Sequence, residues 1–203
     1  MVTMTAKQWY ELGVEKMPHV NIIPALTGLR KAFDGAKDDV MNTNGNAYYQ
    51  WSMAIANEKL PQQVIELGGA MGVWDVCMLN SLPSTSKLYS ITLPENGLEY
   101  SFVVDTYPNF VPTVGDDLDL SFWPKDLDWK KTEILFIDTL HEEGQLRKEL
   151  ELYLPLIKPG TLVMLDDIHL NEGMNRVWDD LNYDKFDATD PLHYSGFGLF
   201  IYE

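Results

Sequence analysis

The sequence has very little cysteine, few basic side chains and no long hydrophobic run. Its single cysteine in 203 residues, Cys77, excludes an internal disulfide and a zinc site built on cysteines. No apolar run approaches the roughly 20 residues that cross a bilayer, so we expect no membrane contact. The N-terminus carries neither a basic cluster followed by an apolar stretch nor a small-residue cleavage site. We therefore expect no secretory signal and a cytoplasmic location.

Basic residues are few relative to acids. The chain has 15 Lys and Arg against 31 Asp and Glu, a formal net charge of −16. Residues 1–104 carry a net charge of −3 and residues 105–203 a net charge of −13. Such a surface repels a phosphate backbone, and no Lys/Arg cluster offers a basic groove, so we expect no nucleic-acid partner. Most of these acids serve solubility, and a minority are candidates to hold a cation.

The composition is that of a globular protein with a core. Hydrophobic residues make up 45% and charged residues 23%, and 203 residues fit one domain. No linker rich in Pro, Gly or Ser divides the chain. We interpret residues 1–60 as a helical N-terminal cap or lid and residues 61–203 as the core of the same domain. Within the cap we expect helices at 5–16, 24–34 and 46–59, and a polar loop at 35–45.

From residue 61 onward, predicted strands and helices alternate. Apolar runs bounded by turn residues predict strands at 63–67, 87–93, 110–114, 133–137, 161–165, 185–188 and 197–202. Amphipathic segments predict helices at 73–81, 98–106, 142–154 and 173–181. Such alternation produces parallel pairing through right-handed crossovers. The sequence thus predicts an α/β, Rossmann-like, doubly wound sheet of seven mostly parallel strands, with helices on both faces and an antiparallel C-terminal strand pair.

Residues that could bind a ligand or take part in catalysis lie where the predicted strands end. Ligands of open α/β sheets bind beyond the carboxyl ends of the strands. The residues found at those ends are Gly68, Thr92, Asp116, Asp138, Asp166 and Asp167.

The first strand ends in a glycine-rich turn, E-L-G-G-A-M-G over residues 66–72. Glycine permits positive φ and a close approach of the backbone to a ligand. The dinucleotide fingerprint G-x-G-x-x-G is not met, because Ala70 and Val73 stand where its later glycines belong. The pattern E-x-G-x-x-x-G instead resembles the first motif of class I S-adenosylmethionine-dependent methyltransferases, in particular the small catechol-type O-methyltransferases.

This resemblance covers residues 44–203. It implies that the turn holds the cofactor S-adenosylmethionine through Glu66, Gly68, Gly69 and Gly72, whereas a turn that serves only packing is the alternative. Relatives place an acid at the end of the second strand to grip the ribose. Here Thr92 stands there, and Glu95 is either a replacement ribose ligand or a solvated acid. Asp116 and Asp117 match the segment that meets the adenine, with a solvated acidic loop as the alternative.

Acids also end the fourth and fifth predicted strands. Asp138 and the pair Asp166-Asp167 should converge, since these strands are neighbours in a doubly wound sheet. Three like charges repel one another unless they are protonated or bridged by a cation, and oxygen ligands favour Mg²⁺, Ca²⁺ or Mn²⁺. The arrangement resembles that of cation-dependent O-methyltransferases, which implies that the three aspartates hold Mg²⁺ and that Asp138 also lies at the cofactor. An N-cap role for Asp166-Asp167 is the alternative.

The histidines offer a general base. The segment I-D-T-L-H-E-E resembles the I-D-G-x-H-x-x-E stretch of small family members, which implies that His141, together with Asp138, is catalytic and takes the proton of the acceptor hydroxyl. A surface or helix-capping role is the alternative for His141. His169 is the rival base or a further ligand, and His193 receives no role.

The leading hypothesis is a cation-dependent O-methyltransferase acting on a small hydroxylated molecule. Two alternatives stay open: a non-catalytic protein that binds S-adenosylmethionine or S-adenosylhomocysteine, and a component of a small-molecule hydroxylase system. We allow for a homodimer. Five aromatic residues near the N-terminus either form walls for the acceptor or belong to the helix core, namely Trp9, Tyr10, Tyr48, Tyr49 and Trp51.

Overall fold

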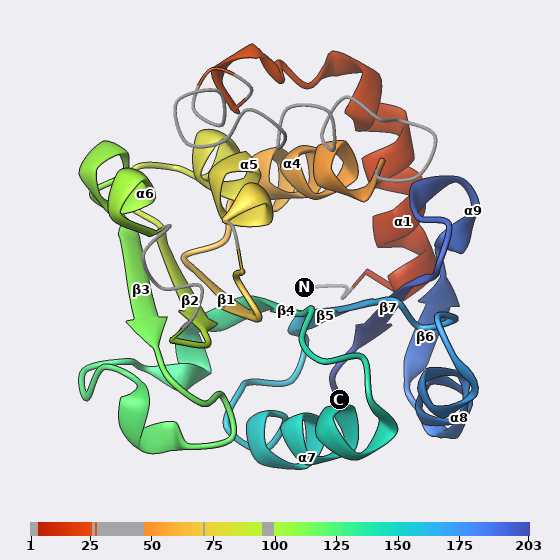
Figure 1. The fold of residues 1–203 in the computed structure, drawn as a ribbon. Helices are drawn as coiled ribbons and strands as arrows, with labels where there is room; N and C mark the ends of the chain where they lie inside the picture. The colour runs from red at the N-terminus through yellow and green to blue at the C-terminus, as the bar shows by residue number, and fades with distance from the viewer. Residues whose placement is uncertain (1–3, 26, 28–46, 71, 95–99) are drawn as a thin grey trace.

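The computed structural model describes residues 4–25, 27, 47–70, 72–94 and 100–203 (Figure 1). Most of the predicted helix at 24–34, the predicted loop at 35–45 and the candidate ribose ligand Glu95 lie outside the described residues.

The described chain forms a sheet of seven strands in the order β3-β2-β1-β4-β5-β7-β6. Strands β1 to β5 are parallel, and β7 runs antiparallel to both of its neighbours. The predicted fold class is confirmed. The strands are β1 (Gln63–Leu67), β2 (Lys87–Thr92), β3 (Phe110–Val114), β4 (Thr132–Ile137), β5 (Leu162–Asp166), β6 (Asp184–Asp187) and β7 (Phe197–Ile201).

Helices cover both faces of this sheet (Figure 1). On one face lie α1 (Ala6–Lys16), α4 (Tyr48–Lys59), α5 (Val73–Ser81) and α6 (Tyr100–Thr106). On the other lie α7 (Glu143–Tyr153) and α8 (Glu172–Asp180), while α9 (Thr189–Leu192) precedes β7. Each face has its own buried core, because successive strand side chains point to opposite faces. Val64 packs with Trp51 and Phe136 on the first face, whereas Ile65 and Leu67 pack in the second core.

Sequence periodicity missed the shortest helical turns. These are the 3₁₀ turns η1 (Met17–His19), η3 (Leu120–Phe122) and η4 (Trp129–Lys131), together with α9. A single turn is too short to show a 3.6-residue period. Local caps support two of them instead: the Asp119 side chain accepts from the Ser121 N–H, and the Asp128 side chain accepts from the Lys130 N–H.

The described part of the N-terminal region packs on the face that carries α5. Helix α1 begins with a capping box formed by Thr5 and Gln8, and the Ala6 N–H donates to the Asp184 Oδ2 of β6 at 2.9 Å. On its inner side, the indole Nε1 of Trp51 donates to the Tyr10 carbonyl at 3.1 Å. The division of the chain into cap and core stays a prediction. None of the described helices combines the length and the apolar character that crossing a membrane requires.

Candidate active site

A pocket of about 290 Å³ lies at the carboxyl ends of the central strands. Its lining includes candidate site residues from the sequence and the glycine beside one of them, namely Gly68, Thr92, Gly115, Asp116, Asp117 and Asp138. Apolar contacts come from Ile91, Leu118 and Leu140. The strand-end residues predicted from separate segments of the chain therefore meet around one cavity, as the parallel sheet requires.

The glycine turn is shaped by its neighbours as well as by the pocket. Gly68 has a φ of +91°, and a Cβ built on it would lie 1.7 Å from the Asp138 carbonyl oxygen. The N–H groups of Gly68 and Gly69 donate to the Ile91 carbonyl at 3.0 and 3.1 Å. Gly72, with a φ of +73°, is the N-cap of α5. Only glycine fits at position 68, so packing accounts for this residue even before a ligand is considered.

Glu66 lies beneath the turn rather than along the pocket. Its carboxylate is buried, accepts from the Ser90 hydroxyl at 2.8 Å and hydrogen-bonds with Asp75 of α5. Burial, followed by the charge of Asp75, raises the pKa of Glu66 well above its usual value, and burial raises the pKa of Asp75 to about 6. This acid pair joins β1 to α5 under the glycine turn. The cofactor role of Glu66 stays a prediction.

A second buried acid, Glu149, is linked through Gln145 to Asp117 of the pocket lining. Asp116 Oδ1 accepts from the Leu118 N–H at 2.9 Å, and both carboxylate oxygens of Asp117 accept from Gln145 at 3.2 Å. Gln145 also donates to Glu149 at 2.8 Å. Burial and then the hydrogen bond with Asp117 raise the pKa of Glu149 to about 8, which keeps it protonated at neutral pH. Sequence reasoning missed Glu149, although an acid between Leu146 and Leu150 on the apolar face of a helix is a usable signal.

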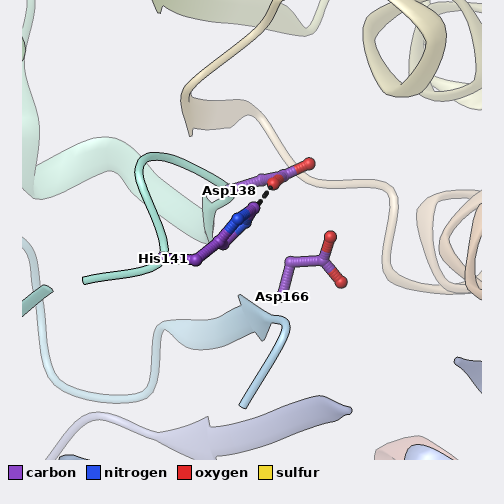
Figure 2. Close-up of side chains that lie close together, drawn as sticks. All are labelled: Asp138, His141 and Asp166. Carbon is purple, nitrogen blue, oxygen red and sulfur yellow. Dashed lines mark hydrogen bonds and ion pairs between the residues drawn. The ribbon is translucent and has the colours of Figure 1, made fainter. Parts of the chain in front are cut away.

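Asp138, His141 and Asp166 come together beside the pocket (Figure 2). Figure 2 shows His141 and Asp138 in the segment after β4 and Asp166 at the end of β5. His141 Nε2 lies 2.9 Å from Asp138 Oδ1, and one ligand atom from each side chain lies within 4.8 Å of the others. Burial lowers the pKa of His141, but the hydrogen bond with Asp138 and the charges of Asp138 and Asp167 outweigh it and raise the pKa overall. The predicted convergence of the two strand ends is therefore present.

Asp167 belongs to a second set of side chains. Its Oδ2 lies 3.3 Å from His141 Nε2, while its Oδ1 accepts from the Ser195 hydroxyl. Asp166, Asp167 and His193 form a group whose ligand atoms lie within 4.8 Å of one another. The three predicted metal ligands thus do not form a single compact triad among the described residues. Asp166 is common to both sets, with Asp138 on one side and Asp167 on the other.

The alternative roles for this region can now be assessed. The N-cap of α8 is Asn171, whose side chain accepts from the Met174 N–H at 3.0 Å, so the N-cap interpretation of Asp166-Asp167 is wrong. His169 is turned away from the acids: its Nδ1 lies 2.6 Å from Asn175 Oδ1 and its Nε2 2.7 Å from Asp187 Oδ2. Both of its ring nitrogens are engaged between α8 and β6, which removes His169 as the rival base.

His193 is the residue near the acids that the sequence did not single out. It lies between α9 and β7, is 6% exposed, and its Nδ1 faces Asp167 Oδ1 at 3.7 Å. No spacing in the sequence connects His193 with Asp167, because their proximity depends on the antiparallel pairing of β5 with β7. Burial lowers the pKa of His193, which favours the neutral imidazole.

Of the five aromatic residues considered as walls, two reach the acid groups. The ring of Tyr48 packs edge-on against His193 with centroids 4.9 Å apart, and burial followed by the charge of Asp166 raises the pKa of its phenol. Tyr49 hydrogen-bonds with Tyr48. Trp51 is fully buried in the helix core. The remaining two pack elsewhere, with Trp9 under the Lys59 ammonium and Tyr10 against Phe186.

Comparison with known families shows which protein family the chain belongs to. A family model described as a methyltransferase domain matches residues 65–168. The chain belongs to this family. The matched stretch of the methyltransferase runs from β1 to just past β5 and includes the glycine turn, Asp138 and Asp166. His193 lies beyond it. A search of curated proteins returned no match.

Solved structures show the same fold at low sequence identity. The O-methyltransferase TomG from Streptomyces achromogenes, in complex with SAM, is 17% identical with a TM-score of 0.68, and 98% of this chain and 100% of that chain are covered. The O-methyltransferase from Bacillus cereus, in complex with SAH, is 13% identical with a TM-score of 0.66 and coverage of 98% and 100%. The SAH-bound methyltransferase PaMTH1 from Podospora anserina is 11% identical with a TM-score of 0.64 and coverage of 100% and 98%. These similarities establish the fold of the methyltransferase.

Proposed function

We propose that this methyltransferase transfers a methyl group from S-adenosylmethionine to a hydroxyl of a small molecule, with a divalent cation assisting deprotonation. The observation that carries the proposal is that one residue joins two sites. Asp138 lines the strand-end pocket and also holds His141 in the acid cluster. A methyl donor in the pocket and a deprotonated acceptor at the cluster would then be adjacent.

The pocket fits an adenosine-containing cofactor. Leu118 and Leu140 provide apolar walls, and Asp116 offers a carboxylate acceptor for an exocyclic amine. Near Gly68 the backbone approaches the cavity without a side chain, and Thr92 would meet the ribose with a hydroxyl in place of an acid. When bound, S-adenosylmethionine supplies an electrophilic methyl group on its sulfonium.

The acid cluster fits a divalent cation. Asp166 Oδ1 is buried and has no hydrogen-bond partner among the described residues, and no Lys or Arg of the described chain forms an ion pair with Asp138, Asp166 or Asp167. An uncompensated buried carboxylate is costly, and a cation would satisfy it. Asp166, which belongs to both groups of potential ligands, would hold the ion together with Asp138 or Asp167. A bound cation lowers the pKa of a coordinated hydroxyl.

His141 is the proposed general base, with Asp138 as its partner. The bond between His141 Nε2 and Asp138 Oδ1 orients the imidazole and stabilises the charge that it gains with the proton of the acceptor hydroxyl. His141 has a φ of +52°, a left-handed conformation that is uncommon for residues other than glycine.

The test has a binding part and a transfer part. Calorimetry measures the affinity for S-adenosylmethionine with and without Mg²⁺, and a labelled methyl donor detects transfer to a panel of phenols, catechols and hydroxylated sugars. We expect His141→Gln to bind the cofactor normally and to lose at least about 100-fold in kcat. His169→Gln changes a ring whose nitrogens face Asn175 and Asp187; it is the matched control and should keep wild-type activity.

Each failure points to a different function. Absence of cofactor binding under both conditions contradicts the proposal and leaves the hydroxylase-component alternative. Binding without transfer to any acceptor indicates a cofactor-binding protein. Equal activity of His141→Gln and wild type removes the general-base role.

A further inference from the structure

We propose that His193 is a metal ligand, and that Asp166, Asp167 and His193 form a cation position that prefers a transition-metal ion to Mg²⁺. This inference rests on the proposed function, which places the methyl acceptor beside this cation position. It adds the class of ion that the site holds.

Strand pairing brings the three residues together. Asp166 is the last residue of β5, and in the antiparallel ladder it faces Phe197, the first residue of β7. The turn before β7 therefore lies against the end of β5 and carries His193 and Ser195 with it. The His169 N–H donates to the Ser195 carbonyl at 2.9 Å and fixes this turn to the segment that follows Asp167.

The distances suit ligands of one ion better than hydrogen bonds. His193 Nδ1 lies 3.8 Å from Asp166 Oδ1 and 3.7 Å from Asp167 Oδ1, beyond hydrogen-bond range. Two donors that each lie about 2.1 Å from a common ion, at angles of roughly 90 to 120°, are separated by about 3 to 3.6 Å. Small side-chain rotations thus bring all three donors to an ion placed between them.

The oxygen of Asp166 that faces this position is unsatisfied. Its Oδ1 is buried and makes no hydrogen bond to the described residues. Native proteins rarely leave a buried carboxylate oxygen without a partner. This unpartnered atom is an observation separate from the acidity of the cluster, and it lies 3.8 Å from His193 Nδ1.

The imidazole of His193 is held in place by its neighbours. Its ring packs edge-on against Tyr48 and stacks with Tyr194, with both pairs of centroids 4.9 Å apart. Ser195 contacts Nδ1 through its N–H at 3.4 Å and its hydroxyl oxygen at 3.0 Å, and an ion bound at Nδ1 would replace these contacts. The Ser195 hydroxyl donates to Asp167 and orients that carboxylate in turn. Such supporting contacts orient ligands around metal ions.

The donor set determines the class of ion. Mg²⁺ prefers oxygen ligands and water in a regular octahedron, whereas an imidazole nitrogen beside carboxylates suits Mn²⁺, Fe²⁺, Co²⁺, Ni²⁺ or Zn²⁺. His141 Nε2 lies 3.3 Å from the other oxygen of Asp167, so a second imidazole borders the same group. The nitrogen content of the site therefore distinguishes it from the all-oxygen Mg²⁺ site that the sequence predicted.

The test uses the full chain, freed of metal by a chelator, without cofactor or acceptor. Calorimetry gives the affinities for Mg²⁺, Mn²⁺ and Co²⁺, and pulsed electron paramagnetic resonance of the Mn²⁺ complex detects coupling to ligand nitrogen. We expect Co²⁺ to bind at least about 100-fold more tightly than Mg²⁺, and nitrogen coupling to be present. His193→Gln should lose this coupling and at least about tenfold in Co²⁺ affinity, whereas His169→Gln should lose neither.

The wild-type measurements alone can overturn the inference, even if His193→Gln fails to fold. Equal affinities for Mg²⁺ and Co²⁺, or a Mn²⁺ complex without nitrogen coupling, contradict it. Nitrogen coupling that disappears in His141→Gln but persists in His193→Gln would show that His141, not His193, is the nitrogen ligand. That result also contradicts the inference. Because no methyl donor is present, these results are independent of the transfer assay, and either proposal can fail while the other stands.

Discussion

Buried acids in this methyltransferase are stabilised in different ways according to their neighbours. Glu66 and Asp75 hydrogen-bond with each other, and Glu149 shares Gln145 with Asp117. In these pairs a proton reduces the repulsion between carboxylates. One oxygen each of Asp75, Glu149 and Asp166 has no hydrogen-bond partner in the described chain, and Asp166 also faces the charges of two further aspartates, Asp138 and Asp167. The acids at the end of β5 are therefore a group whose mutual repulsion a single cation could relieve.

Glu149 is expected to make stability depend on pH. Its pKa rises from 4.5 to about 8 in the folded protein, so the folded state binds this proton more tightly than the unfolded state. The stabilisation is complete below the unfolded pKa and is lost as pH rises through the folded pKa. Wild type should lose up to about 4 kcal/mol of unfolding free energy between about pH 5 and about pH 8.5 from this group, an upper bound.

Glu149→Gln cannot ionise and should remove this part of the decline. Urea unfolding at both pH values measures it, and Glu151→Gln, an exposed position on the same helix, is the control. Identical pH slopes for Glu149→Gln and wild type would show that the proton on Glu149 does not contribute.

At the scale of elements, the attachment of α1 depends on a close approach to α4. A Cβ built on Gly13 of α1 would lie 2.2 Å from Nε1 of Trp51. That nitrogen also donates to the Tyr10 carbonyl. The contact leaves no room for a side chain at position 13, so α1 and α4 can pack this closely only because that residue is glycine.

Gly13→Ala should therefore destabilise the protein. We expect a loss of about 1–3 kcal/mol, since overpacking separates α1 from α4, and this outweighs the gain of up to about 1 kcal/mol from better helix propensity. Urea unfolding measures the change. Gly144→Ala in α7 is the matched control, because a Cβ there meets nothing within 4 Å, and it should be neutral or stabilising. A Gly13→Ala protein as stable as Gly144→Ala would contradict this account of the packing.

The sequence predicted the elements better than it predicted contacts between them. Strands such as 63–67 and 110–114 have the expected bounds because apolar runs end at turn residues. The meeting of Asp138 with Asp166 followed from the order of parallel strands. The approach of His193 to Asp167 did not, because it depends on β7 lying between β5 and β6. Local patterns carry no information on that insertion, nor on which acids pair in the core.

At the scale of the whole molecule, charge opposes compactness. The net charge is −16, and residues 105–203 carry most of the excess. Self-repulsion of this size destabilises the folded state at low ionic strength, and salt screens it over a Debye length of about 10 Å at 0.1 M.

The thermal midpoint should therefore rise by a few degrees as NaCl increases from about 0.01 M to about 0.2 M. Calorimetry of the metal-free protein measures the shift. Choline chloride at the same ionic strength is the control, since a screening effect does not require sodium itself. A midpoint that falls with either salt would show that attractive ion pairs, such as Arg147 with Glu143 and Asp180, dominate over repulsion.

The last strand in the chain, β7, lies inside the sheet rather than at its edge. Strand β7 has neighbours on both sides, and β6, which is synthesised before it, pairs only with β7 among the described strands. During synthesis β6 consequently has no hydrogen-bonded place in the sheet until the chain has passed residue 201. A nascent or truncated polypeptide that stops short of β7 would leave the edge of β5 open to pairing with other molecules. We therefore expect C-terminal deletions that lack β7 to aggregate.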